Sequence, residues 1–368
     1  MTSGLPAGFE PYRDRPVRVG ILGLGRVYDL TNTGYVGNED AEIVALCDTD
    51  AAKLDDRGAD WPDAARYDDV EAFLAHDMDL VEILVPTPAH RDVVCRVLDA
   101  GFHVNVQKPM ARSLAEADAM LEAARRNGRV LRVMENFLFY EPLQRLKAIV
   151  DAGEIGEPAG FHMKMIATGN GGWEVPWESY KWQFEQALEG TGIMMFDDGW
   201  HKYSVARWLF GPVAEVMAWV GRTEIVEGMI VIDAPSTVMW RHTSGLQGTW
   251  DVTFAPDMLM RSRYYSNDER FEVVGRKGWA KVHQCTARGL HVPSLETYVD
   301  GVVTGHHELD DDWASSFRDQ TRHLLRVLRT GEGDLLWSGD DAREVLAFTL
   351  AALESSRRNA PVQVAELG

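Results

Sequence analysis

Cysteine is scarce in this chain, and long hydrophobic runs are missing. The 368 residues include three cysteines, far apart and in no Cys-x-x-Cys pair. We therefore expect a reducing compartment, the cytoplasm, and no thiolate metal site or other bound metal. No stretch approaches the roughly 18 apolar residues of a membrane-spanning helix. The first fifteen residues lack the apolar core of a signal peptide, so we expect no membrane partner.

Basic side chains are also in short supply. The 37 Lys and Arg residues are outnumbered by 57 Asp and Glu residues, for a formal net charge of −20. Because neutralising phosphates requires surplus basic groups, we expect no nucleic-acid partner. A hydrophobic content of 45% and a charged content of 26% are those of an ordinary globular protein. The length favours two domains.

Strand and helix patterns alternate over residues 16–135. Apolar runs predict buried strands at 17–22, 41–47, 80–85, 102–106 and 130–134. Helices are predicted at 91–100 and 113–126, the second opening on Ser113 with Glu116 at capping-box spacing. Such alternation predicts a doubly wound parallel sheet with helices on both faces, the Rossmann architecture.

The pattern changes after residue 135. A helix is predicted at 191–210 and two more at 313–330 and 340–357, while most of 214–282 is extended and 169–183 resembles a loop. We predict an α+β domain with a large, open, mostly antiparallel sheet. The expected organisation is an N-terminal extension (1–15), a Rossmann domain (16–135) and a second domain (136–368) that binds substrate and forms oligomers.

A glycine pair follows the first predicted strand. Gly23 and Gly25 lie where a dinucleotide-binding turn needs them, although Tyr28 occupies the place of the third small residue. Many α/β proteins carry such a pair for other reasons. Asp48 ends the second strand, about twenty residues further on, where a carboxylate binds ribose hydroxyls; the alternative is a solvated carboxylate. With Asp50 nearby and no arginine, a 2′-phosphate would be repelled, so we predict NAD rather than NADP.

Three ionisable residues suit proton transfer. Lys108 follows a buried strand at the edge of the sheet where ligands bind, and its ammonium can hydrogen-bond a substrate hydroxyl. Asp197 and His201 are four residues apart on a predicted helix and share a face, so the carboxylate can orient an imidazole that takes a proton from an alcohol. The alternatives are a surface lysine and an exposed helix ion pair.

The chain resembles the glucose–fructose oxidoreductase/inositol dehydrogenase (Gfo/Idh/MocA) family over about residues 16–365. The order and spacing of several motifs carry the resemblance. These motifs are Val19-Gly20-Ile21-Leu22-Gly23-Leu24-Gly25-Arg26-Val27, His90 followed by Leu98-Asp99-Ala100-Gly101-Phe102-His103-Val104, Lys108-Pro109, Gly153-Glu154-Ile155-Gly156-Glu157-Pro158, Asp197-x-Gly199-x-His201, and Gly275-Arg276-Lys277-Gly278.

The resemblance implies a Rossmann domain, an open-faced α/β domain whose sheet packs in homodimers or homotetramers, and NAD(P)-dependent oxidation of sugars, inositols or related polyols. It implies that Lys108 matches the lysine of the family's EKP motif and that Asp197 and His201 match its DxGxH acid–base pair. The implied cofactor-binding residues are Gly23, Gly25, Arg26, Val27, Asp48, Pro86, His90 and Lys108.

Three residues depart from the family pattern. Gln107 replaces the usual acid before the lysine, which removes a charge that could hold Lys108 protonated. Phe139 lies where many members have an arginine, so an apolar group is predicted at the substrate site. Ser204 replaces a frequent aspartate one turn after the histidine.

An aromatic segment precedes the Asp/His helix. Its residues Trp173, Trp177, Tyr180 and Trp182, with Phe139, are predicted to contact substrate, because aromatic faces suit sugars. Equally open is a segment packed on its own domain or in a subunit interface. The aromatic reading favours a glycoside with an aromatic or bulky aglycone over a sugar phosphate.

The predicted function is therefore NAD-dependent oxidation of a secondary hydroxyl of a sugar, glycoside or polyol. A nicotinoprotein that shuttles hydride between two sugars, and a dihydrodiol-type dehydrogenase, are alternatives within the enzymes. A non-catalytic NAD-sensing regulator is a further alternative, but such a protein would be expected to lose Lys108, Asp197 and His201, which this chain retains.

Overall fold

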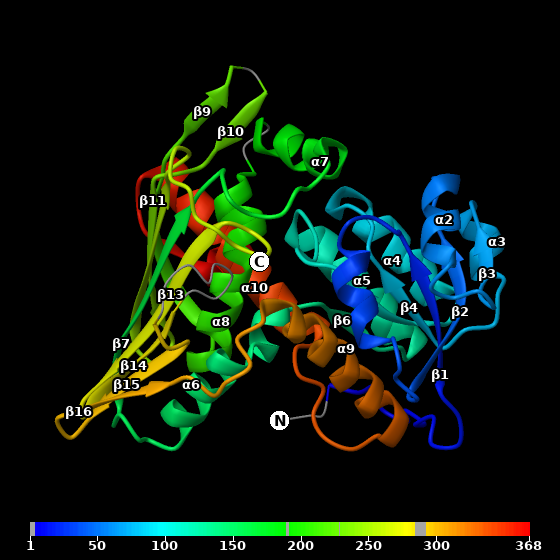
Figure 1. Cartoon of the computed structure of the whole chain (residues 1–368), viewed down its shortest axis with the longest axis horizontal. Helices are drawn as coiled ribbons and strands as arrows, with labels where there is room; N and C mark the ends of the chain where they lie inside the picture. The colour runs from blue at the N-terminus through cyan, green and yellow to red at the C-terminus, as the bar shows by residue number, and fades with distance from the viewer. Residues whose placement is uncertain (1–3, 189–190, 228, 284–291) are drawn as a thin grey trace. The chain divides into compact units, whose positions relative to one another are not determined.

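The computed structural model describes residues 4–188, 191–227, 229–283 and 292–368. It divides into two compact units (Figure 1): unit 1 consists of Met1–Asn136 with Phe317–Leu346, and unit 2 of Phe137–Ser316 with Ala347–Gly368. The predicted change of domain near residue 136 coincides with the first crossing between units. The chain returns to unit 1 at residue 317, however, which the sequence did not predict.

Unit 1 is built on a six-stranded parallel sheet with the order β3-β2-β1-β4-β5-β6. This order confirms the predicted Rossmann sheet. The strands are β1 (Val17–Leu22), β2 (Ala41–Cys47), β3 (Ala65–Tyr67), β4 (Leu80–Ile83), β5 (His103–Val106) and β6 (Leu131–Val133). The helices before residue 136 are α1 (Tyr28–Thr31), α2 (Ala51–Gly58), α3 (Val70–Leu74), α4 (His90–Asp99) and α5 (Leu114–Asn127).

The C-terminal helix α9 (Trp313–Thr330) explains the return to unit 1. Its leucines Leu324, Leu325 and Leu328 are buried in one cluster with Val17 and Val19 of β1. Burying a leucine side chain stabilises a fold by about 1.5–3 kcal/mol, so this apolar face fixes the helix to the Rossmann sheet. The compact units therefore differ from the predicted second domain, 136–368, because these leucines pack in the core of unit 1.

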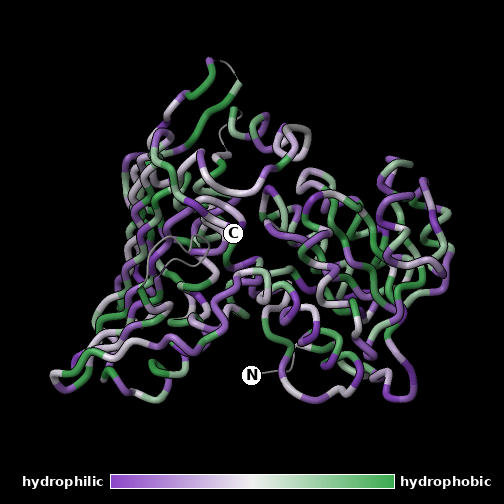
Figure 2. The backbone as a smooth tube through the Cα atoms, in the orientation of Figure 1, coloured by the Kyte–Doolittle hydropathy of each residue, from purple (hydrophilic) through white to green (hydrophobic). Residues whose placement is uncertain are grey.

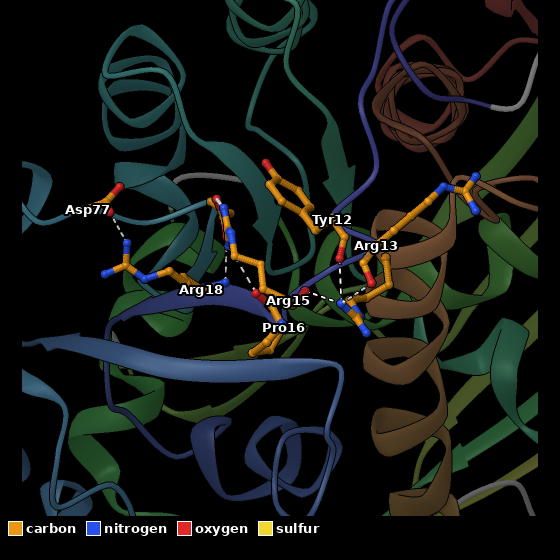
Figure 3. Close-up of polar contacts among 8 residues, drawn as sticks. Tyr12, Arg13, Arg15, Pro16, Arg18 and Asp77 are labelled. Atoms are coloured by element: carbon orange, nitrogen blue, oxygen red, sulfur yellow. Dashed lines mark hydrogen bonds and ion pairs between the residues drawn. The ribbon is translucent and has the colours of Figure 1, made fainter.

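The N-terminal extension is bound to unit 1 by arginines (Figure 3). The Arg329 guanidinium on α9 donates to the carbonyl oxygens of Tyr12 at 2.6 Å and Arg13 at 3.2 Å, and also to that of Arg15. Arg15 in turn forms a two-point ion pair with Asp79, at 2.5 and 2.8 Å. Residues 12–15 are thus held within the Rossmann unit by these contacts.

Unit 2 contains a nine-stranded sheet with the order β16-β15-β14-β13-β7-β12-β11-β8-β17. All neighbours are antiparallel except β7 and β12, so the mostly antiparallel sheet is confirmed. Its strands are β7 (Pro158–Ala167), β8 (Val213–Val220), β11 (Ser236–His242), β12 (Gln247–Phe254), β13 (Asn267–Gly275), β14 (Gly278–His283), β15 (Leu295–Val299), β16 (Val302–His306) and β17 (Val362–Gln363).

Helices cover one face of this sheet and leave the other open (Figure 1). On the covered side lie α6 (Glu141–Asp151), α8 (Gly199–Phe210) and the second half of α10 (Gly339–Arg358). Buried and exposed residues alternate along strands such as β11 and β12, and the tube of this sheet accordingly alternates between hydrophobic and hydrophilic colour (Figure 2). This period of two is typical of a sheet with one face on a core.

Two local predictions in unit 2 are corrected. Part of the segment predicted as a loop forms helix α7 (Trp177–Leu188), which packs beside the hairpin β9 (Thr223–Val226) and β10 (Ile230–Ile232). The helix predicted at 191–210 is a π-helical turn (Ile193–Asp198) followed by α8. Periodicity did not reveal the π turn because it has only six residues, and its first four, Ile193-Met194-Met195-Phe196, are all apolar.

A buried carboxylate lies inside the parallel sheet of unit 1. Glu82 on β4 accepts hydrogen bonds from the Tyr35 hydroxyl at 2.8 Å and from the Asn105 amide at 2.7 Å, and Arg132 donates to Asn105 at 3.0 Å. Burial raises the pKa of Glu82 to about 7, against the opposing effect of these bonds and of Arg132. The folded protein therefore binds a proton at Glu82 at pH values where the unfolded chain has released it.

The Glu82→Gln variant should remove a pH dependence of stability. In the native chain, the free energy of unfolding falls as the pH rises from about 4.5 to about 7, because the folded state then loses its favoured proton. The variant keeps an acceptor for Tyr35 and Asn105 but has no group that titrates there. When the pH is raised from 5 to 8, the free energy of unfolding of the native chain should therefore fall by up to about 3 kcal/mol more than that of the variant. Urea unfolding at both pH values measures this. Glu39→Gln, at an exposed position of the same unit, is the control; equal slopes for native protein and Glu82→Gln would contradict the assignment.

Candidate active site

Four loops meet at the carboxyl edge of the unit 1 sheet, where ligands bind in this architecture. The Gly23 amide donates to the carbonyl oxygen of Cys47 at 2.8 Å. Gly23 has φ +93°, and a Cβ there would lie 2.9 Å from the carbonyl carbon of Leu84. A side chain is therefore excluded by the backbone after β4. A Cβ on Gly25 would meet nothing within 4 Å, so the chain leaves open space at the second glycine.

The Asp48 carboxylate is held at the end of β2. One oxygen accepts from the Leu24 amide at 2.7 Å and the other from the Asp50 amide at 2.9 Å. Each carboxylate oxygen can accept a further hydrogen bond, which fits a ribose hydroxyl. The structure also brings Lys53 to 4.0 Å from Asp48, a neighbouring cation that the sequence did not reveal. The open glycine and the oriented acceptor together fit a dinucleotide.

The turn after Gly25 leads into a very short helix. Val27 precedes α1, which has four residues, and Arg26 pairs with Asp29 at 2.5 Å. The helix dipole available to a pyrophosphate is correspondingly small. Tyr28, in place of the third small residue, is buried, and its hydroxyl donates to Asp60 at 3.0 Å. The departure from the glycine pattern is therefore a packing substitution.

His90 joins the loops after β4 and β5. It is fully buried; Nε2 lies 2.9 Å from the Val85 carbonyl oxygen and Nδ1 lies 2.9 Å from that of Pro109. Burial lowers the pKa of His90. The side chain thus supports the loop that carries Lys108 rather than facing outward, whereas Pro86, also predicted to contact cofactor, is exposed.

Lys108 follows β5 by two residues and is half-buried. Its amide donates to the side-chain oxygen of Gln107 at 2.8 Å, and the Gln107 amide donates to the Ile83 carbonyl oxygen at 2.9 Å. The glutamine that replaces the family's acid therefore fixes the backbone at Lys108. Lys108 belongs to unit 1, and the predicted acid–base pair belongs to unit 2.

In unit 2, Asp197 and His201 lie on either side of the junction between the π turn and α8. Asp197 is half-buried, and His201 is 7% exposed. The imidazole stacks on Phe137, with ring centroids 4.2 Å apart and planes 18° from parallel. A Cβ on Gly199 would lie 2.9 Å from the Trp250 ring. The glycine of the DxGxH pattern therefore lets the helix approach the sheet.

Asp233 holds the start of the π turn. Its two carboxylate oxygens accept from the Met194 and Met195 amides, each at 2.7 Å, and a Cβ on Gly192 would overlap this carboxylate. Burial raises the pKa of Asp233, although these amide bonds oppose the shift. Sequence reasoning missed Asp233, because it lies after β10, distant in sequence from the helix it caps.

The aromatic segment is packed against its own unit. The Trp173 amide donates to the Tyr264 carbonyl oxygen at 2.8 Å, and its ring lies edge-on to Tyr264 and Tyr265, both at 5.5 Å. Burial raises the pKa of Tyr265, and Tyr180, Asp197 and Asp198 add to the shift. Tyr265 therefore interacts with two predicted substrate residues, Trp173 and Tyr180, and is within electrostatic range of the carboxylates of the π turn.

The remaining predicted substrate residues differ in exposure. Phe139 is buried and Trp182 is half-buried, while the side chain of Trp177 lies outside the described residues. Burial limits Phe139 to a small part of any binding surface. The Ser204 hydroxyl, where the family often has an aspartate, is buried, with no hydrogen-bond partner within the described ranges.

Among the described residues, no three or more His, Cys, Asp and Glu side chains are grouped so that they could hold a metal ion. In the same part of the chain, no helix has the length and apolar content needed to cross a bilayer.

Comparison with known proteins identifies both parts of the chain. Residues 17–135 match the model of the oxidoreductase family with an NAD-binding Rossmann fold, GFO_IDH_MocA, and residues 143–281 match that of the GFO/IDH/MocA C-terminal domain. A D-apiose dehydrogenase of Rhizobium rhizogenes is 31% identical over 88% of this chain and 90% of its own length. Another, of Paraburkholderia graminis, is 29% identical over 89% and 84%.

Further relatives have related names. The D-glucoside 3-dehydrogenase of Escherichia coli is 30% identical over 53% of this chain and 54% of its own length. Among solved structures, an oxidoreductase from Agrobacterium radiobacter in complex with NAD+, L-tartaric acid and magnesium has a TM-score of 0.80 at 23% identity, covering 96% of this chain and 99% of that one. At that identity the likeness shows the fold alone. The two family matches and the full-length relatives show that the chain belongs to the Gfo/Idh/MocA family of NAD-binding oxidoreductases.

Proposed function

We propose that this chain oxidises a secondary hydroxyl of a sugar, glycoside or polyol to a ketone, with NAD as the acceptor. The observation that carries the proposal is the setting of His201. An imidazole that is 7% exposed, stacked on an aromatic ring and four residues from a half-buried carboxylate has the surroundings of a general base. Lys108 adds a half-buried ammonium after β5.

Each proposed side chain has a separate task. His201 takes the proton of the substrate hydroxyl, Asp197 stabilises the resulting imidazolium, and Lys108 donates a hydrogen bond to the reacting oxygen. The nicotinamide, when bound, accepts the hydride. Gly23, Gly25 and Asp48 would hold the dinucleotide, through the open backbone turn and the carboxylate acceptor, with Arg26, Val27 and Pro86 on adjoining loops. His90 acts through the loop that it supports.

The aromatic groups support a glycoside substrate. Trp173 and Tyr180 both interact with Tyr265, whose pKa is also raised by Asp197 of the π turn. Aromatic faces suit the apolar face of a sugar or an aromatic aglycone. A relative named as a glucoside dehydrogenase agrees with this substrate class. A tightly bound NAD that serves two sugars in turn, and a dihydrodiol substrate, are the competing enzymatic proposals. A cofactor-sensing regulator is disfavoured, because Lys108, Asp197 and His201 are all retained.

Purified protein should reduce NAD in the presence of a member of this substrate class. In a panel of glycosides, free aldoses, inositols and dihydrodiols, we expect NADH absorbance to rise fastest with an aryl glycoside. NAD should be preferred to NADP, because Asp48 and Asp50 oppose a 2′-phosphate more than the single Lys53 attracts it. Preference for free sugars would contradict the glycoside proposal. Equal use of NADP would contradict the cofactor preference, and nucleotide released only on denaturation would favour the nicotinoprotein.

Removing the proposed acid–base groups should abolish most turnover. Lys108→Ala and His201→Ala should each lower kcat at least about 100-fold, because proton transfer from a positioned side chain contributes roughly that much. Steady-state kinetics with the best substrate measure this. Lys277→Ala and His307→Ala, at exposed positions, are matched controls and should retain kcat. A loss below about threefold in Lys108→Ala or His201→Ala would rule out the assigned role.

We also propose that the open face of the unit 2 sheet joins copies of this chain. Trp219 on β8 and Met239 on β11 are 54% and 43% exposed, and adjacent strands place them on one face because Met239 pairs with Met217, two residues from Trp219. Light scattering should give a dimer or tetramer mass for the native chain and a smaller mass for the double variant Trp219→Asp/Met239→Asp. A monomeric native chain at about 10 μM would reject this surface.

A further inference from the structure

A lysine is buried in the helix that carries the proposed base. The side chain of Lys202 is 1% exposed, and its ammonium lies 2.6 Å from Asp198 and 3.1 Å from Glu269, whose side chain is also 1% exposed. Burial opposes charge on Lys202, but the two carboxylates more than offset this and raise its pKa. A buried cation of this kind is stable only while its anionic partners remain.

The three charges connect three elements of unit 2. Asp198 is the last residue of the π turn, Lys202 lies one turn into α8, and Glu269 lies on β13. The Asp198–Lys202 ion pair spans the junction between the π turn and α8. The Lys202–Glu269 ion pair then fixes this junction to the sheet.

The same junction carries the proposed catalytic groups. Phe137 stacks on the His201 imidazole at 4.2 Å, and its ring centroid lies 5.2 Å from the Lys202 ammonium. Asp197 directly precedes Asp198, so the π turn carries two adjacent carboxylates. Since Lys202 neutralises Asp198, the second carboxylate does not compete with Asp197 for the imidazolium that forms on His201.

The cluster is not an efficient way to stabilise a fold. The second carboxylate oxygen of Glu269 is buried and has no hydrogen-bond partner among the described residues. Replacing a buried ion cluster by apolar side chains of similar size often leaves a protein equally or more stable. Sites where the local rules of packing are broken are typically functional sites. The position of this cluster beside His201 indicates which function it serves.

We propose that Lys202, Asp198 and Glu269 are positioning residues, which hold the π turn so that Asp197 and His201 are aligned for proton transfer. This inference rests on the proposed function, because it takes His201 as the base. The three residues act through Asp197 and His201, not by contact with substrate.

Charge-balanced variants separate positioning from stability. Lys202→Met alone should lower Tm strongly, because Glu269 is left buried without its cation. The double variant Lys202→Met/Glu269→Gln removes that unpaired charge and should recover most of the lost Tm. If the cluster positions the base, kcat of the double variant should remain at least tenfold below that of the native chain, with KM changed less than threefold.

The matched control is Lys147→Met/Asp151→Asn. Lys147 and Asp151 form an exposed ion pair of the same i,i+4 spacing in the same unit, at 2.9 Å, and Lys147 also lies 5.6 Å from the Trp208 ring of α8. This control should retain kcat. A kcat of Lys202→Met/Glu269→Gln within threefold of native would overturn the inference and leave a purely structural cluster. If that variant does not fold, Asp198→Asn, at the 20% exposed end of the cluster, is judged by the same two thresholds.

Hydrogen exchange distinguishes failure of this inference from failure of the proposed function. Amides of residues 193–201 should exchange at least tenfold faster in Lys202→Met/Glu269→Gln than in the native chain or the control, whether or not a substrate is known. Unchanged exchange would overturn the positioning role. Faster exchange in a chain that reduces no NAD with any panel member would reject the proposed function while retaining the structural effect of the cluster.

Discussion

The chemistry of unit 1 depends on how closely the ends of its central strands approach. Gly23 leaves no room for a side chain, because the backbone after β4 lies within 2.9 Å of where its Cβ would be. The same residue bonds the end of β2 through Cys47. One backbone contact therefore brings together the turn at Gly25, the carboxylate of Asp48 and the loop that His90 fixes to the backbone at Pro109. Because β1 pairs in parallel with β2 and β4, the carboxyl ends of the three strands lie at one edge of the sheet. The Asp48 carboxylate and the open turn at Gly25 therefore lie at that same edge.

In unit 2 the proposed base, His201, lies on a helix rather than at a strand end, so its orientation depends on how that helix is held. Helix α8 packs closely against the sheet where Gly199 meets the Trp250 ring, and this contact orients the helix. The π turn before α8 needs further support: Asp233 bonds its first amides, and the Lys202 cluster fixes its last residue. Wide turns of this kind are uncommon and recur at functional sites. Two separate anchors on six residues agree with that association.

Much of the fold could be predicted from the sequence, because periodicity reports burial directly. The continuous apolar runs of unit 1 predicted its parallel sheet, and the mostly extended stretch 214–282 predicted the antiparallel sheet of unit 2. Helix α7 was missed because Gly and Trp in the preceding segment resemble a loop, while the helix itself has no strong apolar stripe. The return of α9 to unit 1 could not be seen either, since an amphipathic helix does not encode which core it covers.

In the proposed site, too, residues within local sequence motifs could be predicted, and residues that act through contacts distant in sequence could not. Gly23, Asp48, Lys108, Asp197 and His201 have recognisable local patterns. Asp233, Tyr265 and Glu269 do not, because each interacts with residues far away in sequence and lies in or beside a strand without a recognisable motif.

The two buried glutamates, Glu82 and Glu269, differ in the groups that bond them. Burial raises the pKa of both Glu82 and Glu269 to about 7, yet their partners differ. Two neutral donors bond Glu82, with Arg132 as a nearby cation in the scaffold of unit 1, whereas an ammonium beside the proposed base bonds Glu269 directly. A buried acid bonded by neutral groups can be replaced by an amide that keeps the hydrogen bonds. Such a replacement changes the stability of the protein and leaves the charges of its neighbours unaltered. A buried acid that neutralises a lysine cannot be changed without altering the field around its neighbours. The surroundings of a buried charge, more than its pKa, therefore indicate whether it belongs to the scaffold or to the chemistry.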